Sequence, residues 1–207
     1  MTELIDRIVA VPHNRHRRVI AIAGPPASGK STVAEKLAAQ IDNACVLPMD
    51  GFHLDNAVLD ARGLRHRKGA PQTFDADGFV SLIRSLQTPG PIAVPTFDRD
   101  LDAVVPNGAS ILANCDTVMV EGNYLLLDTS PWDQLSQEWD FSIYLDVPLD
   151  ILRERLIQRW LDHGFNHEDA VKKAESNDIP NAEEIVQNGF RADLNCTNWG
   201  KPSDFDL

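Results

Sequence analysis

The sequence predicts an α/β fold with a mainly parallel sheet, and three observations support this prediction. Short apolar runs rich in β-branched residues alternate along the chain with longer segments of helical spacing. The first run, residues 19–23, leads directly into a glycine-containing loop and then a helical pattern. Two later runs each end on a carboxylate, Asp50 and Glu121. Strands that alternate with helices form parallel sheets, and ligands bind beyond the carboxyl ends of such strands.

Hydrophobic spacing defines the individual elements. Residues 3–11 fit a short amphipathic helix, and from Lys30 onward Val33, Leu37 and Ile41 recur every four residues, as on one face of a helix. Further helices are expected at residues 74–86, 149–161 and 167–188. Strands or extended segments are expected at residues 19–23, 45–49, 92–95, 117–120 and 141–147.

The connecting segments are more polar. Residues 51–73 contain basic residues and glycines, so a long loop is expected there. Residues 104–113 are expected to form a hairpin around Pro106-Asn107-Gly108. The stretch at residues 177–181 resembles a helix break with capping residues, and the basic stretch at residues 13–18 resembles a solvated lead into the first strand.

Composition limits the class of protein. A chain of 207 residues suits one domain, and its net charge of -12 argues against a binder of nucleic acid or of membrane surfaces. The three cysteines are widely spaced without a CxxC pair, which fits a reducing compartment better than a disulfide framework. We find no secretory signal and no apolar run long enough for a membrane span. We therefore expect a cytoplasmic protein that neither inserts into membranes nor binds nucleic acid.

The stretch GPPASGKST, which follows the first strand, matches the phosphate-binding pattern G-x-x-x-x-G-K-[ST]. Glycines allow a tight turn, and the backbone amides before a helix form a site for phosphate oxygens. Lys30 can reach the β- and γ-phosphates, and Ser31 can bind Mg²⁺. We expect ATP and Mg²⁺ here, with nucleotide contacts from Gly24, Pro25, Ala27, Ser28, Gly29, Lys30, Ser31 and Thr32.

Two carboxylates distinguish a kinase from other nucleotide-binding proteins. Asp50 can orient an acceptor hydroxyl and take its proton, and Glu121 can hold Mg²⁺ directly or through water. No NKxD guanine-reading motif and no ABC-type signature is present. This combination favours phosphoryl transfer to a small molecule over a switch GTPase or a motor. A regulatory switch that hydrolyses ATP slowly is the alternative from another class.

The predicted helix at residues 149–161 carries Arg153, Arg155 and Arg159, of which the last two lie four residues apart on one face. Arginines at this place can close over the triphosphate and stabilise charge in the transition state. The alternative is an ordinary ion-paired surface.

The segments GPPASGKST, MDGFH, TFDADGF, PTFDRD, VEGNYLLLD and RLIQRW, in this order, resemble the phosphoribulokinase/uridine kinase/pantothenate kinase family. Within it, the chain is most similar to the bacterial branch labelled fructose transport system kinase or fructokinase. The resemblance implies a P-loop kinase fold: a five-stranded, mainly parallel sheet flanked by helices. It also implies a small substrate lobe inserted at about residues 51–113 and a helical lid at about residues 153–168.

The resemblance also implies site roles. Asp50 matches the catalytic acid, Glu121 the carboxylate after a core strand, and Arg155 and Arg159 the lid arginines. Asp75 matches a residue that contacts acceptor hydroxyls in uridine kinases. The residues expected to contact the acceptor are His53, Arg67, Asp75, Asp98, Arg99 and Tyr124.

The identity of the acceptor stays open among several classes. Uridine kinases usually carry Asp-Ser-Phe-Tyr where this chain has Asp50-Gly51-Phe52-His53, and Pro-x-Tyr-Asp where it has Pro95-Thr96-Phe97-Asp98. The Phe52-His53 pair resembles phosphoribulokinases, which favours a sugar or similar polyol, of fructose type. A nucleoside or a pantothenate-like acceptor is the alternative, and the sequence leaves a homodimer open. The basic cluster at residues 62–68 either lines the acceptor pocket or is a solvated loop.

Overall fold

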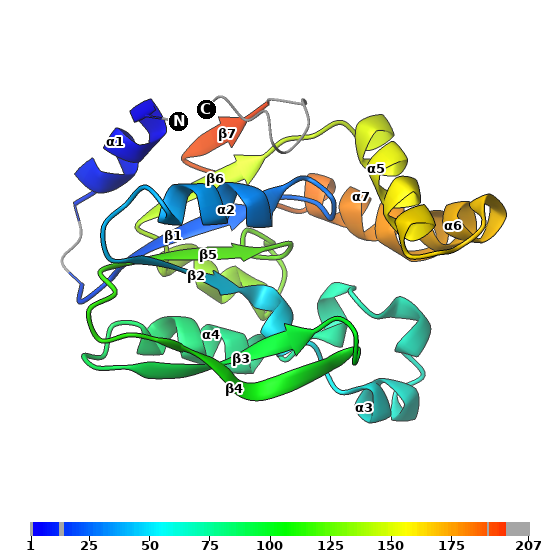
Figure 1. Cartoon of the computed structure of the whole chain (residues 1–207), viewed down its shortest axis with the longest axis horizontal. Helices are drawn as coiled ribbons and strands as arrows, with labels where there is room; N and C mark the ends of the chain where they lie inside the picture. The colour runs from blue at the N-terminus through cyan, green and yellow to red at the C-terminus, as the bar shows by residue number, and fades with distance from the viewer. Residues whose placement is uncertain (1, 13–14, 190, 198–207) are drawn as a thin grey trace.

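A five-stranded parallel sheet forms the centre of the computed structural model, which describes residues 2–12, 15–189 and 191–197. The strands are β1 (Arg18–Ala23), β2 (Ala44–Pro48), β5 (Thr117–Gly122), β6 (Phe141–Leu145) and β7 (Leu194–Cys196). Their order is β2-β5-β1-β6-β7, and each neighbouring pair is parallel (Figure 1). The predicted parallel sheet is confirmed, with β7 as a strand that the sequence patterns did not predict.

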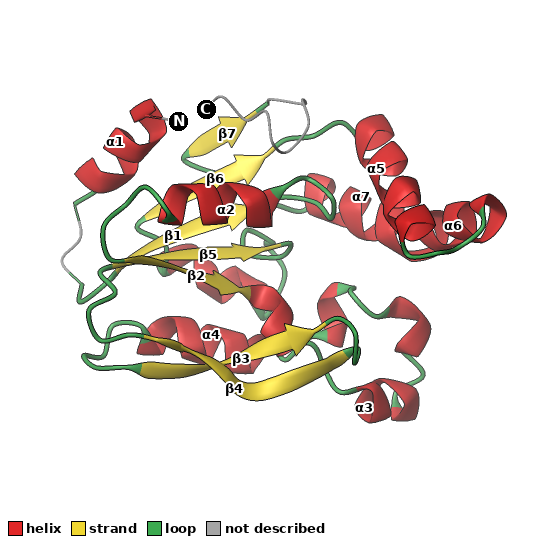
Figure 2. Ribbon diagram, viewed as in Figure 1, coloured by secondary structure: helices red, strands yellow, loops and turns green. Residues whose placement is uncertain are grey.

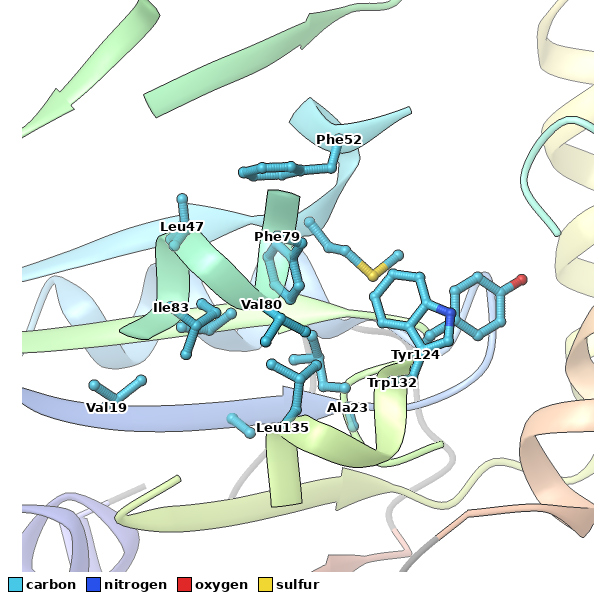
Figure 3. Close-up of a cluster of buried hydrophobic side chains, with 14 of the residues drawn as sticks. Val19, Ala23, Leu47, Phe52, Phe79, Val80, Ile83, Tyr124, Trp132 and Leu135 are labelled. Atoms are coloured by element: carbon cyan, nitrogen blue, oxygen red, sulfur yellow. The ribbon is translucent and has the colours of Figure 1, made fainter. Parts of the chain in front are cut away.

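Helices cover both faces of the sheet, as Figure 2 shows. Because side chains alternate along a strand, Ile20 and Ile22 of β1 pack on one face with α1 (Thr2–Ala10) and α2 (Lys30–Ala38). Val19, Ala21 and Ala23 pack on the other face with α4 (Ala76–Ser85) and the 3-10 segment η4 (Trp132–Gln137). Phe79, Val80, Ile83, Trp132 and Leu135 belong to the buried cluster on this face of the sheet (Figure 3). The helices predicted at residues 3–11 and 74–86 are therefore confirmed within about two residues at each end.

A separate two-stranded antiparallel sheet is made by β3 (Ile92–Asp98) and β4 (Ala103–Ile111). The predicted hairpin at residues 104–113 is wrong, because β4 runs without a turn through residues 103–111 and the turn falls at residues 99–102. Asn107 has a left-handed backbone, with φ of 55°, and the register with β3 shifts between Val94 and Thr96. The Asn107-Gly108 pair thus lies in a β-bulge. Bulges and two-residue hairpin turns both use a left-handed backbone, so the same residue pair can indicate either.

The segment at residues 51–73 is not the long loop that its composition predicts. It contains η1 (Met49–Phe52), α3 (Asn56–Ala61), η2 (Arg65–Arg67) and η3 (Pro71–Thr73). These helices have at most six residues, too few to show a hydrophobic period in sequence. Together with the hairpin they lie beside the carboxyl end of β2 (Figure 1).

The C-terminal helices form a continuous path from α6 (His167–Lys173) through a π-helical segment, η5 (Ala174–Asp178), into α7 (Ile179–Gln187). The helix break predicted at residues 177–181 is therefore wrong. Pro180 lies in the first turn of α7, and the wider π turn before it accommodates a residue without an amide proton. α5 (Leu149–Asp162) packs against this path.

Arg17 contradicts the expectation of a solvated lead before β1. Its side chain is fully buried and donates hydrogen bonds to four backbone carbonyl oxygens, those of Leu86, Thr88, Gly90 and Cys115. These bonds tie the end of α4 and the following turn to the sheet. Among the described residues, no helix is long and apolar enough to cross a membrane.

Candidate active site

The loop between β1 and α2 has the conformation of a phosphate-binding site. Gly29 has φ of 97° directly before α2, a value that glycine reaches without strain. The hydroxyl oxygen of Ser28 is fully buried and has no hydrogen-bond partner among the described residues. A buried polar atom without a partner is costly unless a ligand satisfies it. The loop therefore fits a phosphate group at the N-terminus of α2.

Lys30 begins α2 and lies at the centre of the site. Its side chain is buried, and Nζ donates a hydrogen bond of 2.8 Å to the carbonyl oxygen of Pro25. Burial lowers the pKa of Lys30 to about 8, although the carboxylates of Glu121 and Asp50 oppose this shift. The lysine is thus held inside the loop, close to both predicted acids.

Glu121 and Ser31 form the candidate metal site. The Ser31 hydroxyl donates a hydrogen bond of 3.1 Å to Oε1 of Glu121, which joins the start of α2 to the end of β5. Burial raises the pKa of Glu121, while the nearby positive charge of Lys30 opposes the shift. Both groups offer the oxygen ligands that Mg²⁺ prefers.

Asp50 lies beyond the end of β2, as predicted. Its Oδ2 accepts a hydrogen bond of 2.7 Å from Nη2 of Arg99, which belongs to the turn between β3 and β4. Nδ1 of His53 lies 2.7 Å from the backbone oxygen of Asp50, so Nδ1 carries the proton and Nε2 is free to accept one. Burial lowers the pKa of His53, and its ring packs between Phe74 and Phe97 at 4.1 and 4.6 Å.

Close backbone packing holds Asp50 in place. A Cβ atom added to Gly51 would collide with the carbonyl oxygen of Pro95 in β3. Only glycine allows the hairpin to approach the Asp50 turn this closely. The residue type at position 51 therefore determines where the hairpin stands relative to Asp50.

A cleft of about 950 Å³ joins these groups. Its walls include Lys30, Ser31, Asp50 and Glu121 on the sheet side, and His53, Phe97 and Arg99 on the side of the hairpin. Arg159 and Trp160 of α5 close a further wall. The volume is large enough for a nucleotide and a second small molecule together.

The arginines of α5 differ in their surroundings. Arg159 lines the cleft, and Nη1 of Arg155 donates a hydrogen bond of 3.3 Å to the carbonyl oxygen of Ala27 in the phosphate loop. Arg153 forms an exposed ion pair with Glu175 instead. Arg155 and Arg159 therefore share the face of α5 that is turned toward the phosphate loop and the cleft, as their spacing of four residues predicts.

Four of the predicted acceptor residues do not line this cleft. Asp75 caps α4 by accepting a 3.0 Å hydrogen bond from the amide of Gly78, and Asp98 accepts the amides of Asp100 and Leu101 in the hairpin turn. Arg67 donates to Asn181, and the hydroxyl of Tyr124 donates to the carbonyl oxygen of Gly69. The Tyr124 ring is fully buried, and burial raises its pKa. In this structure each of the four side chains has a partner within the protein, and their acceptor contacts stay a prediction.

Several cleft residues were not predicted. They are Asp102, Trp160, Asn177, Asp178 and Asn181. Arg65, His66 and Lys68 also line the cleft, and they belong to the basic cluster at residues 62–68, for which the sequence left a pocket wall open as one interpretation. Trp160 donates a hydrogen bond of 2.7 Å to Asp178, and burial raises the pKa of this carboxyl. The helical period of residues 167–188 could have placed Asn177 and Asn181 on one face, but it gives no partner across the cleft.

A parallel sheet with a phosphate loop after its first strand, and with acids at the ends of two neighbouring strands, defines a P-loop kinase. A family model described as the Phosphoribulokinase / Uridine kinase family matches residues 19–201. The chain belongs to this family. It is therefore an ATP-dependent kinase that phosphorylates a hydroxyl group.

Relatives and a solved structure agree with this assignment. The uncharacterised protein YggC of Escherichia coli is 39% identical, over 87% of this chain and 77% of that protein. A protein of Schizosaccharomyces pombe provisionally named a uridine kinase is 33% identical, over 93% of this chain and 88% of that protein. A pantothenate kinase of Klebsiella pneumoniae is 31% identical, and the match covers 76% of this chain but only 54% of that enzyme.

A crystal structure from Silicibacter sp. TM1040 is similar throughout, with a TM-score of 0.91 and 43% identity. The match covers 94% of this chain and 98% of that one. That protein is provisionally named a fructose transport system kinase. The expected family and fold are thus confirmed, whereas the relatives carry several different substrate names.

Proposed function

We propose that this protein transfers the γ-phosphoryl group of Mg-ATP to a hydroxyl of a sugar or similar polyol, of fructose type. The observation that carries the proposal is the position of Asp50, which shares one cleft with Lys30 and the Ser31–Glu121 pair. A nucleotide held at the phosphate loop would direct its terminal phosphate toward Asp50. The similarity to the Silicibacter protein supports a sugar acceptor.

The residues present fit a magnesium ion. Mg²⁺ binds through one or two protein oxygens and takes its other ligands from phosphates and water. Ser31 and Glu121 provide such oxygens, and the described residues contain no cluster of three or more His, Cys, Asp or Glu that suggests another kind of metal centre. When bound, the ion supplies positive charge that neutralises the phosphates.

Asp50 would orient the acceptor hydroxyl and accept its proton as the oxygen attacks the γ-phosphorus. The bond between that phosphorus and the β,γ-bridging oxygen breaks, and ADP leaves. Lys30, Arg155 and Arg159 would stabilise the charge on the transferring group. His53 would accept a hydrogen bond from a second acceptor hydroxyl at Nε2. These roles combine positioning with electrostatic stabilisation, as phosphoryl transfer requires.

We assign residues 51–113 as the acceptor lobe and residues 153–168 as the lid of a single kinase domain. His53, Phe97 and Arg99 of the first region line one side of the cleft, and Arg159 and Trp160 of the second line another. A cytoplasmic location fits both the use of ATP and the free thiols of Cys45, Cys115 and Cys196.

A nucleoside acceptor is the second candidate, because the S. pombe relative named a uridine kinase matches along almost the whole chain. A pantothenate-like acceptor follows from the Klebsiella relative in the same way. Phe74 and Phe97, which pack against His53 in the cleft wall, offer apolar surface that could contact a base as well as a sugar.

The decisive experiment measures ADP formation from Mg-ATP with fructose, other sugars, sugar alcohols, uridine, cytidine and pantothenate. We expect stimulation by a sugar or polyol that disappears in Asp50→Asn. Stimulation by uridine or pantothenate alone would transfer the assignment to that class. Slow hydrolysis indifferent to every alcohol would contradict an acceptor kinase of any of these types.

A further inference from the structure

The ion pair between Arg99 and Asp50 connects the tip of the hairpin to the proposed proton acceptor. Nη2 of Arg99 donates to Oδ2 of Asp50 at 2.7 Å, and among the described residues Arg99 has no second hydrogen-bond or ion-pair partner. Both side chains line the cleft. The hydrogen bond that holds the Arg99 side chain is therefore made to Asp50, the proposed proton acceptor.

This arrangement conflicts with transfer to a neutral alcohol. The guanidinium of Arg99 covers Oδ2 of Asp50, one of the two oxygens that could receive the acceptor proton. The arginine also occupies space beside the carboxylate, where the acceptor hydroxyl must lie. Efficient transfer is thus expected only after Arg99 leaves Asp50.

The pair is built so that it can open. The side chain of Arg99 is 67% exposed and that of Asp50 is 31% exposed. Exposed ion pairs of this kind contribute little to stability, because water and salt screen them. Arg99 can therefore exchange Asp50 for another anion at small cost.

Lys68 and Arg65, two further cationic side chains of this wall, are each paired with carboxylates of the same lobe. Lys68 donates to Oδ1 and the backbone oxygen of Asp102 and to Oδ1 of Asn56, which uses its three ammonium protons. Arg65 forms ion pairs with Asp60 and Asp102. Arg99 is consequently the cation of this wall whose charge can be redirected without leaving a structural carboxylate unpaired.

We propose that Arg99 binds an anionic group of the acceptor, and that the preferred acceptor is a polyol that carries a carboxylate or a phosphate. Binding of that group removes the guanidinium from Asp50 and places the acceptor hydroxyl next to the freed carboxylate. Arg99 thus couples recognition of the anion to release of the proton acceptor. The inference rests on the proposed kinase function and narrows its substrate class.

Matched pairs of acceptors test the inference directly. Each pair differs by one acidic group: glycerol and glycerate, sorbitol and gluconate, fructose and its 1- or 6-phosphate. We expect kcat/KM to be about 10- to 100-fold higher for the anionic member of at least one pair, the range expected for a charged hydrogen bond. The carboxylate and phosphate arms identify which acidic group the site accepts.

Arg99→Gln keeps the length of the side chain and removes its charge. We expect this variant to raise KM for the preferred anionic acceptor about 10- to 100-fold. Turnover of neutral acceptors should rise instead, because Asp50 is then no longer paired with Arg99. Arg99→Lys should restore part of the preference. The control is Arg62→Gln, which removes a charge from an exposed residue of the same lobe that does not line the cleft.

A binding measurement separates this inference from the proposed function. Calorimetric titration of the same pairs, with ADP present, reports acceptor binding even where no turnover occurs. Preference for an anionic member that is lost in Arg99→Gln and kept in Arg62→Gln supports the inference.

Three results would overturn it: no binding of any anionic member, equal binding within every pair, or an equal effect of Arg99→Gln on all acceptors. The last result would assign Arg99 to the transferring phosphoryl group instead. A sugar kinase that prefers neutral acceptors would leave the proposed function intact and remove only the role of Arg99.

Discussion

The ammonium of Lys30 donates its hydrogen bond to the carbonyl oxygen of Pro25, within the same loop that is shaped for phosphate. The lysine is thereby held where the oxygens of a nucleotide would lie. A charged side chain buried in this way needs partners, and here they are one carbonyl oxygen and the nearby carboxylates of Glu121 and Asp50. When a nucleotide binds, charged phosphate oxygens would replace the neutral carbonyl oxygen of Pro25 as the hydrogen-bond acceptor for Lys30.

Lys30→Met should abolish nucleotide turnover, because it removes the charge that contacts the phosphates and keeps a similar side-chain volume. The protein should stay folded, since burying an ammonium group is itself costly. The measurement is thermal unfolding with and without Mg-ATP. We expect a clear upward shift of the wild-type Tm and little shift of the variant; an equal shift in both would exclude the phosphate contact.

The pH dependence of nucleotide binding follows from the lowered pKa of Lys30. Since burial lowers this pKa from 10.5 to about 8, the free protein loses the lysine proton as pH rises above 8, whereas the unfolded chain keeps it until about pH 10.5. ATP binding should therefore weaken above pH 8, by up to about tenfold per pH unit. For the same reason the lysine makes the free energy of unfolding rise with pH between 8 and 10.5.

Dissociation constants for ATP measured from pH 7 to 9.5 test this dependence. Lys30→Arg is the matched variant, because arginine keeps its charge over the whole range. Its binding should be independent of pH, whether or not its affinity is lower. A wild-type profile that is equally flat would contradict the low pKa.

Asp50→Asn should lower kcat by about 10²–10⁴-fold with the preferred acceptor, the usual contribution of a general base. The affinity for ATP should change little, because Asp50 lies on the acceptor side of Lys30. Asp77→Asn is the control, since Asp77 is exposed and lies outside the cleft lining. A fully active Asp50→Asn enzyme would show that another group accepts the proton.

The arginines of α5 provide an internal comparison. Arg159→Ala should reduce kcat by about 10³-fold, because this residue lines the cleft beside the phosphate loop. Arg153→Ala removes the same chemical group from the same helix but affects only the surface pair with Glu175. Its kcat should stay within about twofold of the wild type. Similar losses in both variants would indicate damage to α5 rather than loss of a catalytic charge.

Variants of Asp75 distinguish a helix-capping role of this residue from a role in acceptor binding. Because its side chain caps α4, Asp75→Ala should lower the free energy of unfolding by about 1 kcal/mol, and Asp75→Asn should not. Denaturant unfolding measures the first effect. Neither variant should change the acceptor KM by more than about twofold; a large rise in KM for Asp75→Asn would establish the acceptor contact that the family resemblance implies.

The nucleotide half of the site could be predicted from sequence because its residues are contiguous and its chemistry is local. GPPASGKST specifies the turn, the helix start, the lysine and the hydroxyl within nine residues. Asp50 and Glu121 were predictable because parallel strands bring their carboxyl ends to one edge. In each case one local pattern and one rule of sheet geometry were sufficient.

The acceptor half was harder to predict because it depends on pairing between distant segments. Arg99 reaches Asp50 across 49 residues, and Asn177 donates to the carbonyl oxygen of Lys68 across 109. No spacing rule connects such positions. Tyr124 and Asp75 look equally suited to binding in sequence, and only the fold reveals that one is buried and the other caps a helix.

The close approach of β3 to Gly51 also affects how such enzymes can be redesigned. Uridine kinases usually have serine at this position, and a serine here would place Cβ against the carbonyl oxygen of Pro95. A hairpin taken from a uridine kinase is fitted to a serine at position 51, so it would pack correctly here only if residue 51 is exchanged together with the hairpin. Position 51 and the hairpin therefore form one structural unit, in which neither part can be exchanged without the other.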